Sequence, residues 1–507
     1  MTDPPRVEES TPVGGDAHPG LSPILRRGVT VSSVGFVAVE LIAIVQLVAL
    51  ARLLSPGEIG AFTAGTALSG LVVTVSQGGL RSALVQRDRD VARASITVFW
   101  AALGNGVVTS LAMLAVSPLI ATLFGSHVAG IIAAVTAGMP LLHSLTVVPD
   151  ALLQRGFGFG RRMIVNVSTA ISFAIVAVTL AALGLGVWAL VAATYASQVT
   201  WLGSSWLLAG WWPRHGRPSL RLWRELARYA VPLVVANLAW RLQEILEYFA
   251  VARWLGQPTL GQYRYGRRLA TLPGLALYEV VGYALFPAFS RIATEPDRFR
   301  QAFLRALRWI WCAAVPVAGL MIALGEPAVV VVLGERWRDA GVVLTALAGL
   351  SLGQAMAVVA NEVIQGSGRS YLMNRMTVAA LGSAMVLVAM LMPSFGVAGV
   401  GLAISSGGIV LGVTGLWLSR RIVGATIGAT LKCLVPTFIA GVFGVAAVAP
   451  LEHLVIHSDR RGIVGLAILV GEGTALVGAF LLALRLLAPS TVTAATQAIR
   501  EVLRRQD

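Results

Sequence analysis

Charged residues are scarce in this chain. Only 12% of its 507 residues are Asp, Glu, Lys or Arg, whereas 56% are hydrophobic. Soluble globular proteins carry about 25% charged residues, so the composition excludes a water-soluble protein of this length. The apolar residues also form long blocks, and about 20 such residues are enough for an α-helix to cross a bilayer. The sequence therefore predicts an all-α polytopic membrane protein.

Cysteine and lysine are nearly absent. Cys312 and Cys433, the two cysteines, both lie inside apolar runs, so no disulfide framework is expected. Lys432 is the only lysine among 39 basic residues. No cleavable signal peptide is expected either, because the first apolar block is too long for a signal h-region and lacks a small-residue cleavage site. Residues 1–27, rich in Pro, Gly, Asp and Glu, are expected to form a disordered cytoplasmic tail.

About fourteen transmembrane helices are predicted from the apolar blocks. The loops between them are short, and no soluble domain is inserted. The predicted helices cover residues 28–54, 59–79, 96–118, 128–153, 163–184, 187–209, 229–253, 266–288, 304–325, 341–365, 372–392, 396–418, 428–449 and 462–487.

These helices group into larger units. Residues 28–209 and 229–422 are expected to form two six-helix bundles, joined by a basic cytoplasmic linker over 210–228. Helices 13 and 14 occupy residues 423–488. Residues 489–507 are expected to form a cytoplasmic amphipathic tail, because its apolar residues fall near one helical face with the arginines off that face.

The arginines alternate between the two sides of the predicted membrane. The net charge is +15, but the basic residues lie in short runs between apolar blocks, so we expect a topology signal and no nucleic-acid partner. With both termini in the cytoplasm, 29 of the 39 basic residues fall on the cytoplasmic side and nine on the opposite side. An odd number of helices would spoil this alternation.

The chain contains an internal repeat. Residues 51–62 match residues 252–263 at an offset of 201, with identical Ala, Arg, Leu and Gly and an aromatic residue preserved in kind. Residues 186–189 match residues 396–399 at an offset of 210. Six helices separate the matched pairs, so both halves enter the membrane in the same direction. This predicts a parallel repeat with its pseudo-two-fold axis along the membrane normal.

Several short motifs, taken in order, resemble one known family. The sequence resembles the polysaccharide transporter, or oligosaccharide flippase, branch of the multidrug/oligosaccharidyl-lipid/polysaccharide exporter superfamily. The similarity covers roughly residues 25–425. The matching motifs are residues 51–60, 79–87 and 149–157, the group Glu247, Gly256, Leu260, Gly261, Tyr263 and Pro273, and then residues 285–287 and 333–337.

This resemblance implies a fold and a function. It implies a twelve-helix, two-lobed core with a central cavity, often followed by two further helices. It also implies a multi-pass protein of the bacterial plasma (inner) membrane that flips an undecaprenyl-pyrophosphate-linked oligosaccharide from the cytoplasmic to the outer leaflet by alternating access. Membrane lipids, a polysaccharide polymerase and glycosyltransferases are its implied partners. Glu247 stands where an Asp is expected in this family, which puts an ion-coupling role there in doubt.

Charged residues inside the predicted helices are candidates for a cavity. Each charge at mid-bilayer costs about 2.5–3.5 kcal/mol on insertion scales, so such residues usually face a cavity or a partner. Glu40 and Arg241 lie near the middle of helices 1 and 7 and correspond under the 201-residue offset. Glu244 and Glu247 follow Arg241 at steps of three. The three carboxylates are expected to hold Arg241 in place when the cavity is empty, and they are candidates for ion coupling. Arg241 is expected either to face the cavity or merely to pair with Glu244.

Three arginines lie at the predicted outer start of helix 8. Arg264, Arg267 and Arg268 have i, i+3, i+4 spacing and therefore share one helical face. Two interpretations are open, a cationic belt at the membrane interface or a binding site for the pyrophosphate of the substrate. For the second, arginine suits phosphate because its planar fork donates two hydrogen bonds at once.

Other functions fit the sequence less well. A cation-coupled multidrug exporter of the same superfamily is the first alternative, and it would favour an apolar, carboxylate-lined pocket. A membrane sugar polymerase or glycosyltransferase would need a sizeable outer loop, which is absent, so no enzyme is expected. His453 and His457 lie four residues apart, but they lack an HExxH pattern, so neither a metal site nor a cofactor is expected.

Overall fold

The computed structural model describes most of the chain. The expected amphipathic helix over residues 490–505 and the first 20 residues of the expected tail lie outside the described part. The described residues are 21–87, 89–156, 158–213, 217–292 and 294–489.

The first half of the chain is a series of helices. Its long helices are joined by turns of a few residues, and a crossing near residue 140 is broken into three short helices. The helices are α1 Leu21–Leu53, α2 Pro56–Gly78, α3 Leu80–Val85, α4 Val91–Leu123, α5 His127–Thr136, α6 Met139–Ser144, α7 Val147–Arg155, α8 Phe159–Ala182 and α9 Val187–Ala209.

The second half repeats this pattern with longer helices. Short 3-10 or π segments (η1 to η3) connect some of them. The elements are α10 Leu220–Leu255, α11 Gln257–Ile292, α12 Pro296–Leu333, η1 Glu335–Trp337, α13 Arg338–Ala346, α14 Ala348–Gly366, α15 Tyr371–Ile422, α16 Ile427–Leu451, η2 Glu452–Ile456, η3 Ser458–Arg461 and α17 Gly462–Leu487.

The predicted fold class is confirmed. The segment from α5 to α7 and the segment from α13 to α14 each make one crossing, and Gly396 divides α15 into two helices, which gives fourteen crossings among the described residues. By length and composition alone, nine helices of the described part could each span a membrane, with α15 counted once. The exact bounds of the two six-helix units stay a prediction.

Several helices begin earlier than predicted, among them α1, α10 and α11. α1 begins at Leu21, inside the expected tail, and α10 begins at Leu220, inside the expected linker. The Ser219 side chain caps α10 by accepting a hydrogen bond from the Leu222 N–H. α11 begins at Gln257, nine residues before its predicted start. The three arginines of α11, at positions 264, 267 and 268, therefore lie about two turns or more inside a helix. They no longer count as loop residues of the outer side, so six of the nine basic residues expected on that side remain in the count.

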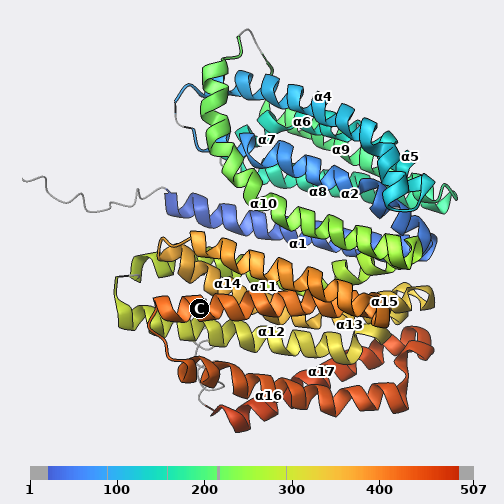
Figure 1. Cartoon of the computed structure of the whole chain (residues 1–507), viewed down its shortest axis with the longest axis vertical. Coiled ribbons are helices and arrows are strands. Elements are labelled where there is room, and N and C mark those ends of the chain that lie inside the picture. Colours follow the sequence, from blue (N-terminus) through green and yellow to red (C-terminus); the bar gives the residue numbers. More distant parts are fainter. Residues whose placement is uncertain (1–20, 88, 157, 214–216, 293, 490–507) are drawn as a thin grey trace, which may run out of the picture.

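The helices form two lobes that lie side by side (Figure 1). Following the predicted units, we call α1 to α9 the N-lobe and α10 to α15 the C-lobe; α10 lies at the boundary, where it contacts α2, α3 and α4 as well as α11. α16 and α17 pack on α12 at the far edge of the C-lobe. We call one end of the molecule the Arg52 end, where α1, α10 and α12 end and α2 and α11 begin. The opposite end is called the Arg81 end.

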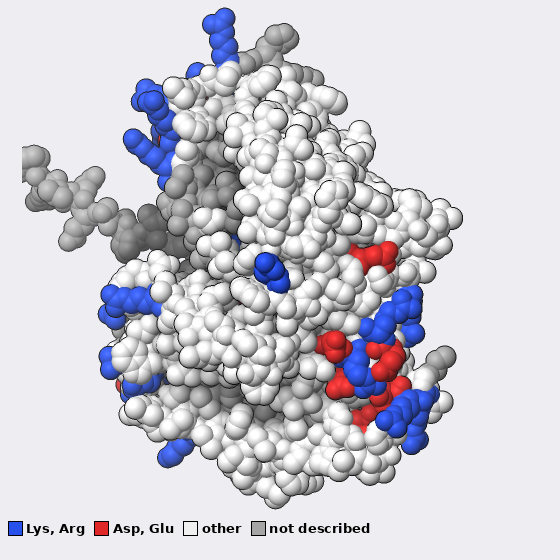
Figure 2. All heavy atoms as spheres, turned by 45° about the vertical axis from the view of Figure 1, so that its right-hand side comes forward, with Lys and Arg blue, Asp and Glu red and all other residues white. Residues whose placement is uncertain are grey.

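Charged residues are distributed differently over the two ends. Figure 2 shows blue surface mainly along the left edge, which is the Arg81 end, and blue mixed with red on the right, at the Arg52 end. At the Arg52 end, just after η1, Arg338 binds three carboxylates, those of Glu326, Glu335 and Asp459. The surface between the two groups is white apart from an isolated blue patch near the centre of the view, as expected for the lipid-facing band of a membrane protein.

The two lobes meet at a symmetric crossing of α2 and α11. A Cβ atom on Gly60 would lie 1.8 Å from the Gln257 carbonyl oxygen, and one on Gly261 would lie 2.0 Å from the Pro56 carbonyl oxygen. Both pairs of positions obey the 201-residue offset, so the contact maps onto itself when the halves are exchanged. Only glycine lets two helix backbones approach this closely.

The second match of the repeat also has a structural counterpart. Gly186 has φ 57° and ψ −133°, and Gly396 has φ 55° and ψ −134°. L-residues other than glycine rarely adopt such a conformation. Each glycine directly precedes the last helix of its six-helix unit, so the two halves use the same turn at the same place.

Candidate functional site

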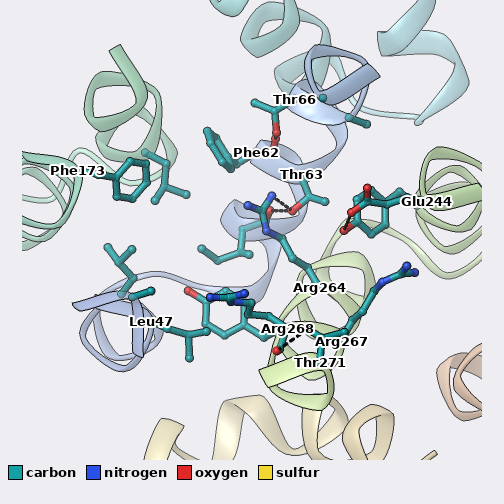
Figure 3. Close-up of a pocket in the computed structure, with 18 of the residues that line it drawn as sticks. Leu47, Phe62, Thr63, Thr66, Phe173, Glu244, Arg264, Arg267, Arg268 and Thr271 are labelled. Carbon is teal, nitrogen blue, oxygen red and sulfur yellow. Dashed lines mark hydrogen bonds between the residues drawn. The ribbon is translucent and has the colours of Figure 1, made fainter. Parts of the chain in front are cut away.

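A cavity of about 1020 Å³ lies between the two lobes. Its N-lobe wall is mostly neutral and includes Leu47, Phe62, Thr63 and Phe173, whereas its C-lobe wall carries most of the charge (Figure 3). The lining residues of the C-lobe wall come from α10 and α11. The cavity is therefore polarised, with apolar and hydroxyl groups on one side and guanidinium groups on the other.

The three α11 arginines all line this cavity, and each has a different partner. Arg267 pairs with Glu247 of α10, within the C-lobe. Arg268 reaches across to the N-lobe, where its Nη2 lies 2.6 Å from Glu40 Oε2. The sequence left open that these arginines form a cationic belt at the membrane interface. Their side chains instead point into the cavity between the lobes (Figure 3).

Arg264 differs from its two neighbours. Its Nη1 donates to Thr63 Oγ1 at 3.0 Å, and its guanidinium lies 5.4 Å from the centre of the Phe62 ring. Thr63 and Arg264 are 201 residues apart, so they are repeat mates that touch across the lobe boundary. Among the described residues, Arg264 is the one cavity arginine with no carboxylate within ion-pair distance.

Arg241 lines the same cavity from α10. Its Nη1 lies 2.6 Å from Glu244 Oε2, and Tyr248 Oη donates to Glu244 Oε1 at 2.9 Å. A Cβ atom on Gly70 of α2 would lie 3.8 Å from the Arg241 guanidinium, so this side chain also reaches the N-lobe. Both sequence interpretations therefore hold in part, since Arg241 pairs with Glu244 and also faces the cavity.

Two carboxylates lie elsewhere than predicted. Glu247 was expected to hold Arg241, but it is fully buried and binds Arg267 and the Tyr263 hydroxyl, the latter at 2.7 Å. Glu40 was expected to meet Arg241 through the repeat, but it binds Arg268. The reason is that Glu247 is nearly two turns from Arg241 and turns toward α11, and the long Arg268 side chain reaches from α11 to Glu40 of α1.

The sequence did not single out one charged pair at the Arg81 end. Arg81 of α3 lines the cavity, and its Nη1 lies 2.7 Å from Oδ2 of the buried Asp150 of α7. Both residues belong to motifs that carry the family resemblance, residues 79–87 and 149–157, and this membership could have identified the pair from the sequence. Arg81 had been explained by topology alone because it lies at the end of a helix.

The cavity is closed at the Arg52 end by contacts between the lobes. Arg52 Nη2 donates to the carbonyl oxygens of Val331 and Val332 at 3.1 and 2.8 Å, at the C-terminus of α12. The Trp337 indole N–H donates to the Ala51 carbonyl at 2.8 Å and the ring stacks on Tyr265. Cations suit helix C-termini because the last carbonyl groups carry partial negative charge.

Two helical bundles on either side of a polar cavity define the class, which is a helical membrane protein with a central cavity between two lobes. The chain belongs to the family described as polysaccharide biosynthesis protein, whose model matches residues 49–342. This is the family that its sequence motifs indicated.

Curated bacterial relatives agree with this assignment. The chain is similar to succinoglycan biosynthesis transport protein ExoT of Rhizobium meliloti (strain 1021), with 28% identity over 302 residues, 59% of this chain and 60% of the relative. It is also similar to lipopolysaccharide biosynthesis protein WzxC of Escherichia coli (strain K12), with 23% identity over 61% of this chain and 63% of the relative. The chain thus aligns with about three fifths of each of these relatives.

Solved structures share the fold. Lipid II flippase MurJ in an inward closed conformation superposes with a TM-score of 0.73 at 14% identity, over 91% of this chain and 99% of that chain. An inward-facing multidrug resistance MATE family transporter of the MOP superfamily gives a TM-score of 0.64 at 17% identity, over 76% and 94%. These likenesses place the chain in the two-lobed, fourteen-helix architecture.

Proposed function

We propose that this protein flips an undecaprenyl-pyrophosphate-linked oligosaccharide from the cytoplasmic to the outer leaflet of a bacterial inner membrane. The observation that carries the proposal is the cavity wall of α10 and α11, where four arginines face the space between the lobes and Glu244 is the carboxylate on the same wall. A substrate whose charged part is anionic fits this wall, and a cationic drug does not.

The substrate's pyrophosphate explains the arginines physically. A bare phosphate charge cannot enter hydrocarbon, because charge burial without a partner costs tens of kcal/mol in an idealised apolar medium. Guanidinium groups stay protonated and offer paired donors that match phosphate oxygens. Arg264 is the best first contact, since the hydroxyl that it holds is a weaker partner than a carboxylate.

Binding can also loosen the lobes. Arg264 and Arg268 both reach from α11 to the N-lobe, through Thr63 and Glu40. A pyrophosphate that competes for these two arginines weakens both contacts between lobes, whereas the Arg267 pair with Glu247 stays within the C-lobe. Alternating access would then follow from differential affinity for the two arrangements of the lobes.

The sugar part has its own wall. Phe62, Phe173 and Thr66 lie on the N-lobe side of the cavity, away from most of the guanidinium groups (Figure 3). Aromatic faces and hydroxyl groups suit a sugar ring, which has apolar faces and polar edges. Glycosyltransferases would supply the lipid-linked sugar and a polymerase would consume it, so the protein itself is proposed to be a transporter and not an enzyme.

Replacing Arg264 with Ala tests this function. The purified full-length protein is placed in liposomes with an undecaprenyl-pyrophosphate-linked oligosaccharide, and transfer between leaflets is measured. Loss of a charge-assisted contact worth about 1.5–3 kcal/mol should lower the apparent affinity roughly tenfold or more. The control is Arg253→Ala, at an exposed arginine of α10 outside the cavity lining. Equal transfer by both variants, or export of cationic drugs in place of the lipid, would overturn the proposal.

The proposed orientation has a separate test. Both termini are proposed to lie in the cytoplasm, so the Arg81 end faces inward and the Arg52 end faces outward. Reporter fusions after Arg217 and after Asp459 should be active inside and outside, respectively. The two residues lie before α10 and before α17. Activity on the same side for both fusions would exclude this topology.

A further inference from the structure

Two acidic residues face each other far from the transport cavity. Glu452 begins η2 at the end of α16, and Glu472 lies ten residues into α17. Their side chains are buried, with residue exposures of 1% and 6%. The two carboxyl groups are neighbours, because α16 packs along α17 and Ser458, which donates to Glu452, lies against Gly465 of α17, two turns before Glu472. Neither residue lines the cavity between the lobes.

Most of their oxygen atoms have no donor. Glu452 Oε1 accepts from the Ser458 N–H at 2.9 Å and from the Ser458 hydroxyl at 2.6 Å. Glu452 Oε2 and both oxygens of Glu472 have no hydrogen-bond partner among the described residues. An ionised carboxylate can only accept hydrogen bonds, so two such groups cannot satisfy each other.

The surroundings are apolar. Val448 precedes Glu452 by one turn, and Leu469 and Leu476 lie on the same face of α17 as Glu472. Leu324 of α12 belongs to the same buried cluster. Two adjacent carboxylates in such a place cannot both stay ionised, because desolvation and like-charge repulsion act in the same direction.

Nearby charged groups of the described chain are already engaged or exposed. Glu326 of α12 and Asp459 of η3 are both bound by Arg338, at 2.6 and 2.7 Å. His453, Arg460 and Arg461 are exposed, and the Arg461 Nε donates to the Ile456 carbonyl. No described arginine or lysine forms an ion pair with Glu452 or Glu472.

We propose that Glu452 and Glu472 form a proton-binding site that holds one proton between their carboxyl groups at neutral pH. One proton removes one charge, supplies the missing donor and joins two of the orphan oxygens. A metal cation fits less well, because the apolar cluster offers it few further oxygen ligands.

The site is connected to the C-lobe. Ser458 donates to Glu452, and the next residue, Asp459, binds Arg338 at the start of α13. A change in the charge of the pair therefore reaches α12 and α13 through one short segment. The helix pair α16–α17 thus carries a titratable group of its own outside the six-helix units.

Infrared difference spectroscopy on the full-length protein in lipid nanodiscs tests the site. The wild type should show the C=O band of a protonated carboxyl group at neutral pH, and Glu472→Gln should lose it. Glu452→Gln should lose it as well, because the new amide donates to Glu472 and no proton is needed. Glu335→Gln, at an exposed carboxylate of η1, should keep the band.

Two results would overturn the proposal. The first is a band that persists in both the Glu472→Gln and the Glu452→Gln proteins, since the proton then lies elsewhere. The second is loss of the wild-type band when sodium or potassium ions are added at constant pH, since a metal cation then occupies the site. Each variant replaces one of the two carboxyl groups that share the proton. If one variant does not fold, the other still tests the site.

Discussion

Arg241 shows how one side chain serves two partners. It lies 2.6 Å from Glu244 on its own helix and also reaches Gly70 of the N-lobe. With 45% of its side chain exposed, the ion pair with Glu244 contributes little to stability by itself. We therefore expect the main role of Arg241 to be in the cavity, where it places a guanidinium group opposite the mostly neutral N-lobe wall.

Replacing Arg241 with Ala should abolish transport and leave the protein in the membrane at its normal level. Replacing it with Lys should rescue transport only in part, because the charge is kept and the two-pronged donor geometry is lost. Polymer export in cells lacking the native protein measures both variants, with immunoblots of the membrane fraction as the control for expression. Wild-type export by the Ala variant would mean that Arg241 is a packing element.

The partners of these charges could not be read from the sequence. An arginine in an apolar helix is conspicuous, so Arg241 and the α11 cluster were identified. The pair of Arg268 with Glu40 spans 228 residues and depends on how the lobes dock. Phe62 and Thr63 were missed because neutral residues in a membrane helix carry no signal. The 201-residue offset from Arg264 to Thr63 was the one available clue.

At the scale of elements, the crossing of α2 and α11 decides how closely the lobes approach. Both helices begin beside this crossing, and Ser55 and Glu58 cap α2 through a reciprocal capping box. The number and order of the helices followed from apolar block length and arginine alternation. The starts of α10 and α11 could not be predicted in this way, because both helices begin with residues that precede their apolar blocks.

Replacing Gly60 with Ala should destabilise the protein, although alanine favours helices. The new methyl group would overlap the Gln257 carbonyl, and overpacking costs about 1–3 kcal/mol, which outweighs the roughly 0.5–1 kcal/mol that alanine gains over glycine in a helix. Thermal unfolding in detergent should show a lower melting temperature. Gly57→Ala is the matched control, since its Cβ would meet only Pro258 at 3.8 Å. Equal melting temperatures would mean that the helices separate without cost.

Asp459 joins the α16–α17 pair to the C-lobe through Arg338. Burial alone would raise the pKa of Asp459, but the hydrogen bond and charge of Arg338 outweigh burial and lower the pKa below its ordinary value. A lowered pKa in the folded state gives stability that is present above the ordinary pKa near 4 and is lost as the pH falls further.

Replacing Asp459 with Asn should therefore lower the melting temperature at neutral pH. The difference from wild type should shrink below about pH 4, where the wild-type carboxylate is also losing its charge. Since Arg338 is partly exposed, the effect should be at most about 1 kcal/mol. Asp339→Asn, at an exposed residue beside Arg338, is the control. A difference that does not change with pH would show that the ion pair is not its source.

At the scale of the whole molecule, the chain is captured with the Arg52 end shut. The symmetric glycine crossing, the Arg52 contacts and the Trp337 contact all join the lobes at this end. The repeat predicts that corresponding residues form similar contacts in both halves, but at the Arg52 end their contacts differ. Arg52 and its repeat mate Arg253 are both exposed, but Arg52 caps α12, whereas Arg253 forms no hydrogen bond or ion pair with any described residue. A transporter needs such asymmetry, because contacts that differ between the ends let one end close while the other opens.

Replacing Arg52 with Ala should shift the protein toward an arrangement that is open at this end. Two hydrogen bonds from a charged donor are lost, each worth about 1.5–3 kcal/mol, and every 1.4 kcal/mol changes the ratio of two states roughly tenfold. Spin labels at the exposed Leu53 and Asp339, in a protein with both native cysteines replaced, report the distance between the lobes. Arg52→Ala should add a population at longer distance, and Arg253→Ala, its repeat mate, should not. If neither variant changes the distances, the packing of α2 on α11 holds this end shut without help from Arg52.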